Sequence, residues 1–115
     1  MPEFDLIILG IGTDGHTASL FPGSPALKEK KRLTAAVIPG GKMHSRVTLT
    51  LPVLNKARNV LFLVTGKEKA EVLRDVAMGS DLSLPASLVV PEKGSILYLA
   101  DSAAGSLLGG KTERQ

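Results

Sequence analysis

The apolar and polar positions of the chain fall into blocks with two different periods. Four segments of four to six mainly apolar residues are predicted to be strands, and the first of them has the length and hydrophobicity of a strand buried on both faces of a parallel sheet. A fifth segment alternates polar and apolar side chains, as a half-buried strand does. The apolar segments are residues 6–9, 33–38, 60–65 and 95–100, and the alternating segment is residues 46–51.

Residues 67–78 have the period of a helix. Ala70, Leu73 and Val76 are spaced to share one face, and a face of this kind packs against a core. Gly79 follows at the position where a glycine commonly ends a helix. Because strands alternate with helical segments, the predicted fold class is α/β, with a mostly parallel, Rossmann-like sheet and flanking helices.

Shorter patterns predict the connecting elements. Thr13 or Asp14 is expected to cap a short helical turn over residues 16–20. Pro52 suits the first turn of a further helix, and Asp101 is expected to cap a weak helix near the end of the chain. The remaining predictions are an exposed polar segment at 26–31, a turn at 39–41, a helix at 52–57, a strand at 88–90 that Pro91 ends, and a helix at 102–108 that Gly109 and Gly110 end.

Composition limits the class of protein. The 115 residues suffice for one domain at most, and 43% of them are hydrophobic. Residues 1–110 are assigned to this domain and residues 111–115 to a polar tail. The lack of cysteine suits the cytoplasm. We expect no membrane association, because the apolar runs are far below the roughly 20 residues that cross a bilayer and the start has no signal-peptide pattern.

Charge and chemistry exclude several kinds of site. The net charge is +3, and the densest basic stretch, residues 28–32, contains no aromatic residue. This favours a solvated surface over a nucleic-acid interface. With two histidines, no cysteine and scattered carboxylates, the sequence predicts no metal site, and no cofactor is expected.

Three glycines directly follow the first apolar segment. Gly10, Gly12 and Gly15 have the GxGxxG spacing of a dinucleotide-binding turn. The rest of that fingerprint is missing, because Pro22 interrupts the helix that the turn should open and no acid ends the second apolar segment. The glycines still permit a sharp turn and a close approach of the backbone to a ligand.

The stretch GIGTDGHTASLFP, residues 10–22, resembles the signature of the 6-phosphogluconolactonase family. That family belongs to a larger group with the glucosamine-6-phosphate deaminases/isomerases, and the GxGxDGH core is common to both branches. The continuation TASLFP has the lactonase form. Residues 46–55, 60–70 and 84–87 resemble further segments of the family. The likeness covers about residues 5–101 but only the C-terminal half of a typical member, which implies a partial domain.

The resemblance implies hydrolysis of a phosphorylated sugar lactone, with His16 as the general base. A histidine suits this role because an unperturbed imidazole is largely neutral at pH 7. Asp14 either orients the imidazole or caps the following turn. Arg46 and Lys69 are implied as phosphate contacts, Lys69 from the first turn of its helix, where free N–H groups favour an anion. Gly12 and Gly15 shape the substrate loop, and His44 is expected at the surface.

Two further hypotheses remain beside the lactonase. The chain is a truncated remnant with little or no activity, or it is a sugar-phosphate binder like the glucosamine-6-phosphate deaminases. Whether it is an enzyme is therefore left open. Its first strand begins at the fifth residue with no preceding element to cover its edge, and proteins seldom leave such an edge open. A homo-oligomer or a complementing N-terminal half is accordingly expected as partner.

Overall fold

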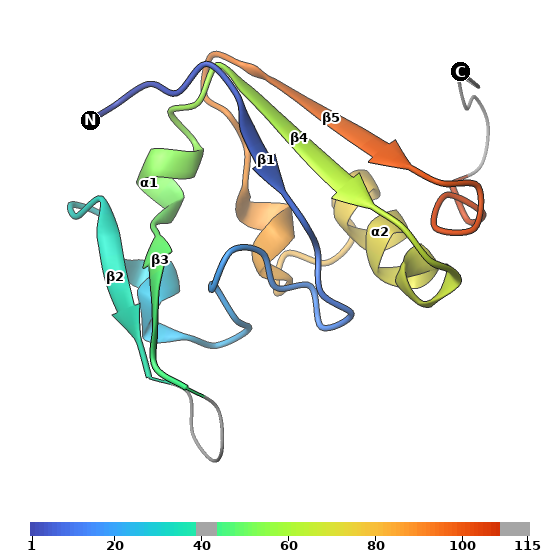
Figure 1. Ribbon diagram of the computed structural model, residues 1–115, viewed down its shortest axis with the longest axis horizontal. Coiled ribbons are helices and arrows are strands. Elements are labelled where there is room, and N and C mark those ends of the chain that lie inside the picture. Colours follow the sequence, from blue (N-terminus) through green and yellow to red (C-terminus); the bar gives the residue numbers. More distant parts are fainter. Residues whose placement is uncertain (39–43, 109–115) are drawn as a thin grey trace.

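A computed structural model describes residues 1–38 and 44–108 and shows two groups of strands (Figure 1). The first is a three-stranded parallel sheet in the order β1-β4-β5, and the second is the antiparallel pair β2-β3. The predicted α/β class with a mostly parallel sheet and flanking helices is thus confirmed. The strands are β1 (Ile7–Leu9), β2 (Thr34–Val37), β3 (Arg46–Leu49), β4 (Asn59–Val64) and β5 (Ser95–Ala100).

Short helices connect these strands. The α-helices are α1 (Leu51–Leu54) and α2 (Ala70–Met78), and three 3-10 turns accompany them. None of the helices in the described part of the chain has the length and apolar character needed to cross a membrane. The turn predicted at 39–41, the helix end predicted at 109–110 and the tail at 111–115 lie outside the described residues. The 3-10 turns are η1 (Pro25–Lys28), η2 (Lys67–Lys69) and η3 (Pro85–Leu88).

The core lies between the sheet and α2. Phe62 in the central strand β4 is fully buried, and its ring stacks on Tyr98 of β5 with centroids 5.4 Å apart. Leu73 and Val76 of α2 are buried, which confirms the apolar face that the helical period predicted. Gly79 ends the helix in the left-handed conformation, with φ 65°, as glycine at this position allows.

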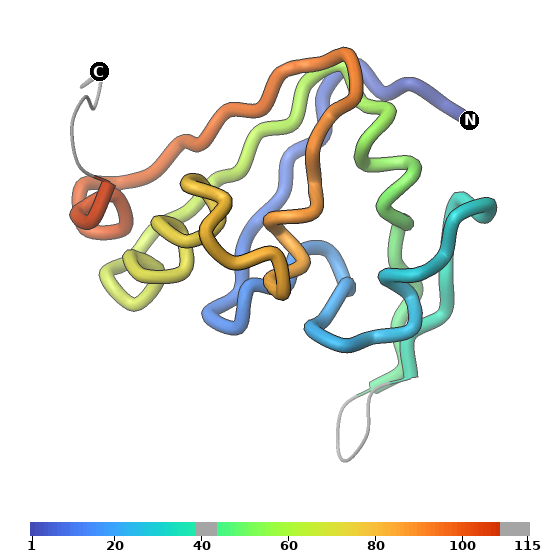
Figure 2. The backbone as a smooth tube through the Cα atoms, turned by 180° about the vertical axis from the view of Figure 1, so that it is seen from behind, coloured from blue at the N-terminus to red at the C-terminus, as the bar shows by residue number. Residues whose placement is uncertain are grey.

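The second face of the parallel sheet is uncovered. Ile8 of β1 and Leu97 of β5 are 59% and 63% exposed, and both pair through Leu61 of β4. Figures 1 and 2 show the helices and the β2-β3 pair on one side of the sheet. The prediction that the first strand is buried on both faces is therefore wrong, because the described helices cover one face only. The open face consists of Leu6, Ile8, Leu63, Leu97 and Leu99.

The helical turn predicted at residues 16–20 does not form. These residues instead make a tight turn with an isolated bridge between Thr17 and Leu20. Asp14 accepts the His16 N–H, and the Thr17 hydroxyl donates to Gly10 O. Side-chain bonds of this kind compete with helical hydrogen bonds. The exposed segment predicted at 26–31 is also wrong in part, because η1 starts there under a Ser24 cap and buries Ala26.

The strand predicted at 88–90 is absent because its backbone finds other partners. The Asn55 amide donates to Leu88 O, and its carbonyl oxygen accepts the Val90 N–H. The Asn55 side chain therefore takes the place of a neighbouring strand. At residues 102–108, Asp101 accepts the Ala104 N–H as the predicted cap does, but only turns follow rather than a helix. Gly105 lies inside this segment, and a glycine weakens a helix.

Candidate active site

The loop after β1 closes on itself over a few residues. The Gly15 N–H donates to Gly12 O at 2.9 Å, and the Gly12 N–H donates to His16 O at 2.8 Å. A Cβ on Gly12 would lie 2.1 Å from His16 Nδ1, so no larger residue fits there without moving the imidazole. Gly15 has φ 85°, and its Cβ would collide with Leu84. Both glycines are thus required by the shape of the loop.

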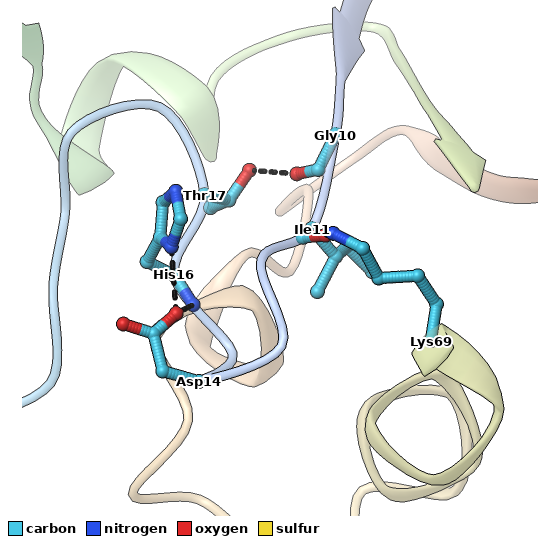
Figure 3. Close-up of polar contacts among 6 residues, drawn as sticks. All are labelled: Gly10, Ile11, Asp14, His16, Thr17 and Lys69. Atoms are coloured by element: carbon cyan, nitrogen blue, oxygen red, sulfur yellow. Dashed lines mark hydrogen bonds and ion pairs between the residues drawn. The ribbon is translucent and has the colours of Figure 1, made fainter. Parts of the chain in front are cut away.

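His16 and Asp14 form a close pair (Figure 3). His16 Nδ1 lies 2.6 Å from Asp14 Oδ1, and the same oxygen accepts the His16 backbone N–H at 3.0 Å. Burial raises the pKa of Asp14, but the hydrogen bonds from His16 outweigh burial and leave the pKa below its usual 3.8. Asp14 is therefore a carboxylate at neutral pH and can only accept. The proton of a neutral imidazole then resides on Nδ1, and Nε2 keeps a free lone pair.

Asp14 thus has contacts suited to both roles that the sequence left open. It bonds the imidazole, and it accepts a backbone N–H of the turn. The helix that it was expected to cap is absent. A carboxylate that contacts the ring nitrogen in this way fixes the tautomer and the orientation of a functional histidine.

Three hydrogen bonds support the loop, one from Thr17 within its own segment and two from η3 and β3. The Thr17 hydroxyl donates to Gly10 O at 2.7 Å, and the Ala86 N–H of η3 donates to Gly15 O at 2.9 Å. Thr48 Oγ1 of β3 accepts the Ser19 N–H at 3.1 Å. Sequence analysis missed Thr17 and Thr48 as supports. The only sequence signal was a hydroxyl residue beside the histidine and a second on the inward-facing side of an alternating strand.

Lys69 reaches the loop from the start of α2. Its ammonium donates to Ile11 O, as Figure 3 shows. The predicted position at the first turn of the helix is confirmed. An ammonium has three donors, so two remain for a ligand.

Phe21 connects His16 with Arg46. The centroids of the Phe21 and His16 rings lie 4.7 Å apart, and Arg46 Cζ at the start of β3 lies 5.7 Å from the Phe21 centroid. Sequence analysis included Phe21 in the motif but gave it no role. Arg46 and Lys69, both expected on one phosphate, approach the loop through different contacts: Arg46 through Phe21 and Lys69 through Ile11.

An open pocket of about 420 Å³ lies at the end of β1. His16, Lys69 and Gly12 line it, together with Ile8 from the uncovered sheet face. Arg46 and Asp14 are not among the lining residues. Within residues 1–38 and 44–108, no three His, Cys, Asp or Glu side chains are grouped to hold a metal ion. An imidazole and an ammonium group thus line the same small pocket.

Comparison with known proteins gives a consistent result. The family described as glucosamine-6-phosphate isomerases/6-phosphogluconolactonase matches residues 1–98. The chain is 48% identical over 109 residues to 6-phosphogluconolactonase of Rattus norvegicus, covering 94% of this chain and 42% of the relative. It is 48% identical over 110 residues to that of Homo sapiens, covering 94% and 43%. The chain thus spans about two fifths of the length of these curated relatives.

Solved structures are similar as well. The 6-phosphogluconolactonase of Trypanosoma brucei superposes with a TM-score of 0.81 at 36% identity, over 94% of this chain and 43% of that one. A monomeric glucosamine-6-phosphate deaminase superposes with a TM-score of 0.65 at 25% identity, over 90% and 47%. These coverages fit a partial domain.

Proposed function

Because the chain belongs to the glucosamine-6-phosphate isomerase/6-phosphogluconolactonase family, we propose that it carries the base and the phosphate contacts of a 6-phosphogluconolactonase. The observation that supports this most is the pairing of His16 with Asp14 at 2.6 Å beside a pocket that also contains Lys69. A base and a cation at one small pocket suit hydrolysis of an anionic ester.

The reaction is attack of water on the carbonyl of a phosphorylated sugar lactone. His16 Nε2 takes a proton from the water as its oxygen bonds to the carbonyl carbon. The bond between that carbon and the ring oxygen then breaks, and the ring oxygen receives a proton and becomes a hydroxyl. Asp14 stabilises the imidazolium in between, because it remains charged. The product is the open-chain acid, 6-phosphogluconate.

Lys69 and Arg46 are proposed to bind the phosphate. Lys69 has donors to spare beyond Ile11 O, and the positive end of the α2 dipole favours an anion nearby. Arg46 is solvent-exposed at the start of β3, so a phosphate that extends from the pocket toward Phe21 would meet its guanidinium. Gly12 and Gly15 contribute by keeping the loop narrow.

Residues 17–22 and the relatives favour the lactonase over the deaminase branch. The curated relatives named above are 6-phosphogluconolactonases at 48% identity, whereas the deaminase structure is 25% identical. We also propose a cytoplasmic location, supported by the absence of cysteine from the sequence.

Hydrolysis of freshly prepared 6-phosphogluconolactone tests the proposal. The acid product releases a proton, so the rate can be followed by pH-stat titration at pH 7. We expect a rate above spontaneous hydrolysis that rises in proportion to protein concentration. A rate equal to the spontaneous background, with the protein folded, would instead favour the remnant without activity.

We further propose that a complementing α/β part covers the open sheet face. Parallel sheets occur almost only with both faces covered, and the relatives have the length to supply such a part, since the chain spans 42% of the rat protein. Ile8 belongs to the open face and also lines the pocket. The covering part would therefore form the missing wall of the site.

Sedimentation analysis tests whether such a covering part binds to the chain. Mixed with the portion of the rat relative outside the matched region, the chain is expected to form a one-to-one complex. Leu97→Lys, in the middle of the open face, should abolish it. Met78→Lys is the matched control, because Met78 is an exposed apolar residue on α2 away from that face. Self-association through the same leucines would indicate a homo-oligomer, and a monomer under all conditions would contradict the proposal.

A further inference from the structure

Phe21 contacts both ionisable side chains on its side of the site, although it has no acid–base chemistry of its own. Its ring lies 4.7 Å from the His16 ring, with the planes inclined by 32°. Arg46 Cζ lies 5.7 Å from the same ring. Two side chains from separate elements, the loop after β1 and the first residue of β3, therefore meet on one aromatic ring.

The Asp14 bond alone does not define the plane of the imidazole. A single hydrogen bond at Nδ1 still lets the ring tilt, because small rotations about the Cα–Cβ and Cβ–Cγ bonds keep the bond while they move Nε2. A second contact on the face of the ring removes this freedom. Phe21 supplies that contact, and the negative face of an aromatic ring also attracts a cation, here the guanidinium of Arg46.

The backbone holds Phe21 firmly on both sides. Leu20 is fully buried, and the Ser24 N–H donates to Phe21 O at 3.0 Å. Pro22 restricts the backbone of the residue before it to extended conformations. The backbone position from which the Phe21 ring projects is thus set by local structure and not by the residues that the ring contacts.

We propose that Phe21 is a positioning residue whose ring fixes the plane of His16 and the place of Arg46, so that base and anion-binding cation keep a constant separation. The inference about structure stands on the contacts alone, and its effect on rate rests on the proposed function. A substrate with its lactone at His16 and its phosphate at Arg46 would then have to match the distance between these two side chains, which Phe21 sets.

Two substitutions at Phe21 distinguish the effect of its aromatic face from the effect of its volume. Phe21→Leu keeps apolar volume but removes the aromatic face, whereas Phe21→Tyr keeps the face. Phe4→Leu is the matched control, because Phe4 is an exposed phenylalanine outside the site. All variants are made with His44→Gln, which leaves His16 as the single imidazole of the chain.

The first measurement uses proton NMR and needs no catalysis. With a phenylalanine or tyrosine at 21, the His16 ring protons are expected to show Overhauser contacts and an upfield ring-current shift. In Phe21→Leu the shift should disappear and the His16 ring should contact Gly12 in more than one orientation. The second measurement is the rate of lactone hydrolysis. Phe21→Leu should lower kcat about 10- to 100-fold, as displaced catalytic groups do, while Phe21→Tyr and Phe4→Leu stay near the parent.

The NMR measurement and the rate measurement test the proposal independently. A His16 ring that keeps one orientation in Phe21→Leu would overturn the positioning role, whatever the activity. Loss of the single orientation of the His16 ring in Phe21→Leu, without a change in kcat, would also overturn the positioning role. If the parent protein shows no hydrolysis, the proposed function fails, and the NMR result alone decides whether Phe21 orients His16.

Discussion

His16→Ala is expected to reduce hydrolysis of 6-phosphogluconolactone by about 100- to 10,000-fold, the usual contribution of a general base. The substitution removes the atom that takes the proton from water and leaves Asp14 without its imidazole partner. Asp14 then loses the side-chain hydrogen bond and the charge of the imidazole, which both lower its pKa, so its pKa should rise. The hydroxide that attacks must then come from bulk water.

The matched control is His44→Ala. His44 is exposed, as the sequence predicted, and none of the site contacts involves it. Initial rates of both variants and the wild type are compared at equal protein concentration, after spontaneous hydrolysis is subtracted. Circular dichroism confirms that each variant is folded. A His16→Ala protein as fast as the wild type would remove His16 from the chemistry and, with it, the proposed mechanism.

Gly12→Ala is expected to be almost as damaging, about 100-fold in kcat/KM, although it deletes no functional group. The new methyl carbon would lie 2.1 Å from His16 Nδ1 and 2.8 Å from Asp14 Oδ1. The imidazole must move, and small displacements of a catalytic group can cost about 100-fold. Gly12 is not one of the described glycines that have a positive φ. The expected loss of activity therefore comes from the clash and not from backbone strain.

Gly10→Ala is the control that shows whether the effect of Gly12→Ala comes from its clash or from a general loss of loop stability. Gly10 precedes Gly12 in the same loop, and a Cβ there meets nothing within 4 Å. Thermal unfolding of Gly10→Ala should match the wild type. Gly12→Ala should unfold at a lower temperature and lose the Overhauser contact between His16 and Phe21. Full activity in Gly12→Ala would show that the loop adjusts without moving the base.

The sequence predicted those elements whose causes are local. The period change at residues 67–78 and the stop at Gly79 correspond to α2, and the apolar run at 60–65 corresponds to β4. The motif at residues 10–22 placed His16, Asp14 and Gly12 in one loop. In each case neighbouring residues determine the conformation, so spacing alone reveals it.

The failures have distant causes. The segment at 88–90 has a strand-like composition, yet Asn55 takes up its hydrogen bonds from 33 residues away along the chain. The contact of Phe21 with Arg46 and that of Thr48 with Ser19 exist only because the β2-β3 pair lies beside the loop. The expectation that the first strand is buried on both faces failed for another reason, because it assumed helices that the described chain does not supply.

The order of synthesis has a consequence for the catalytic loop. Residues 10–16 leave the ribosome before every support of the loop outside its own segment: Thr48, Lys69 and Ala86. Among the described residues β1 pairs with β4, at Ile7 and Val60, and such distant pairings form slowly. The loop therefore lacks its full set of supports until residue 86 has emerged. A ribosome that stalls before that point would hold a nascent chain with the complete signature sequence and no site.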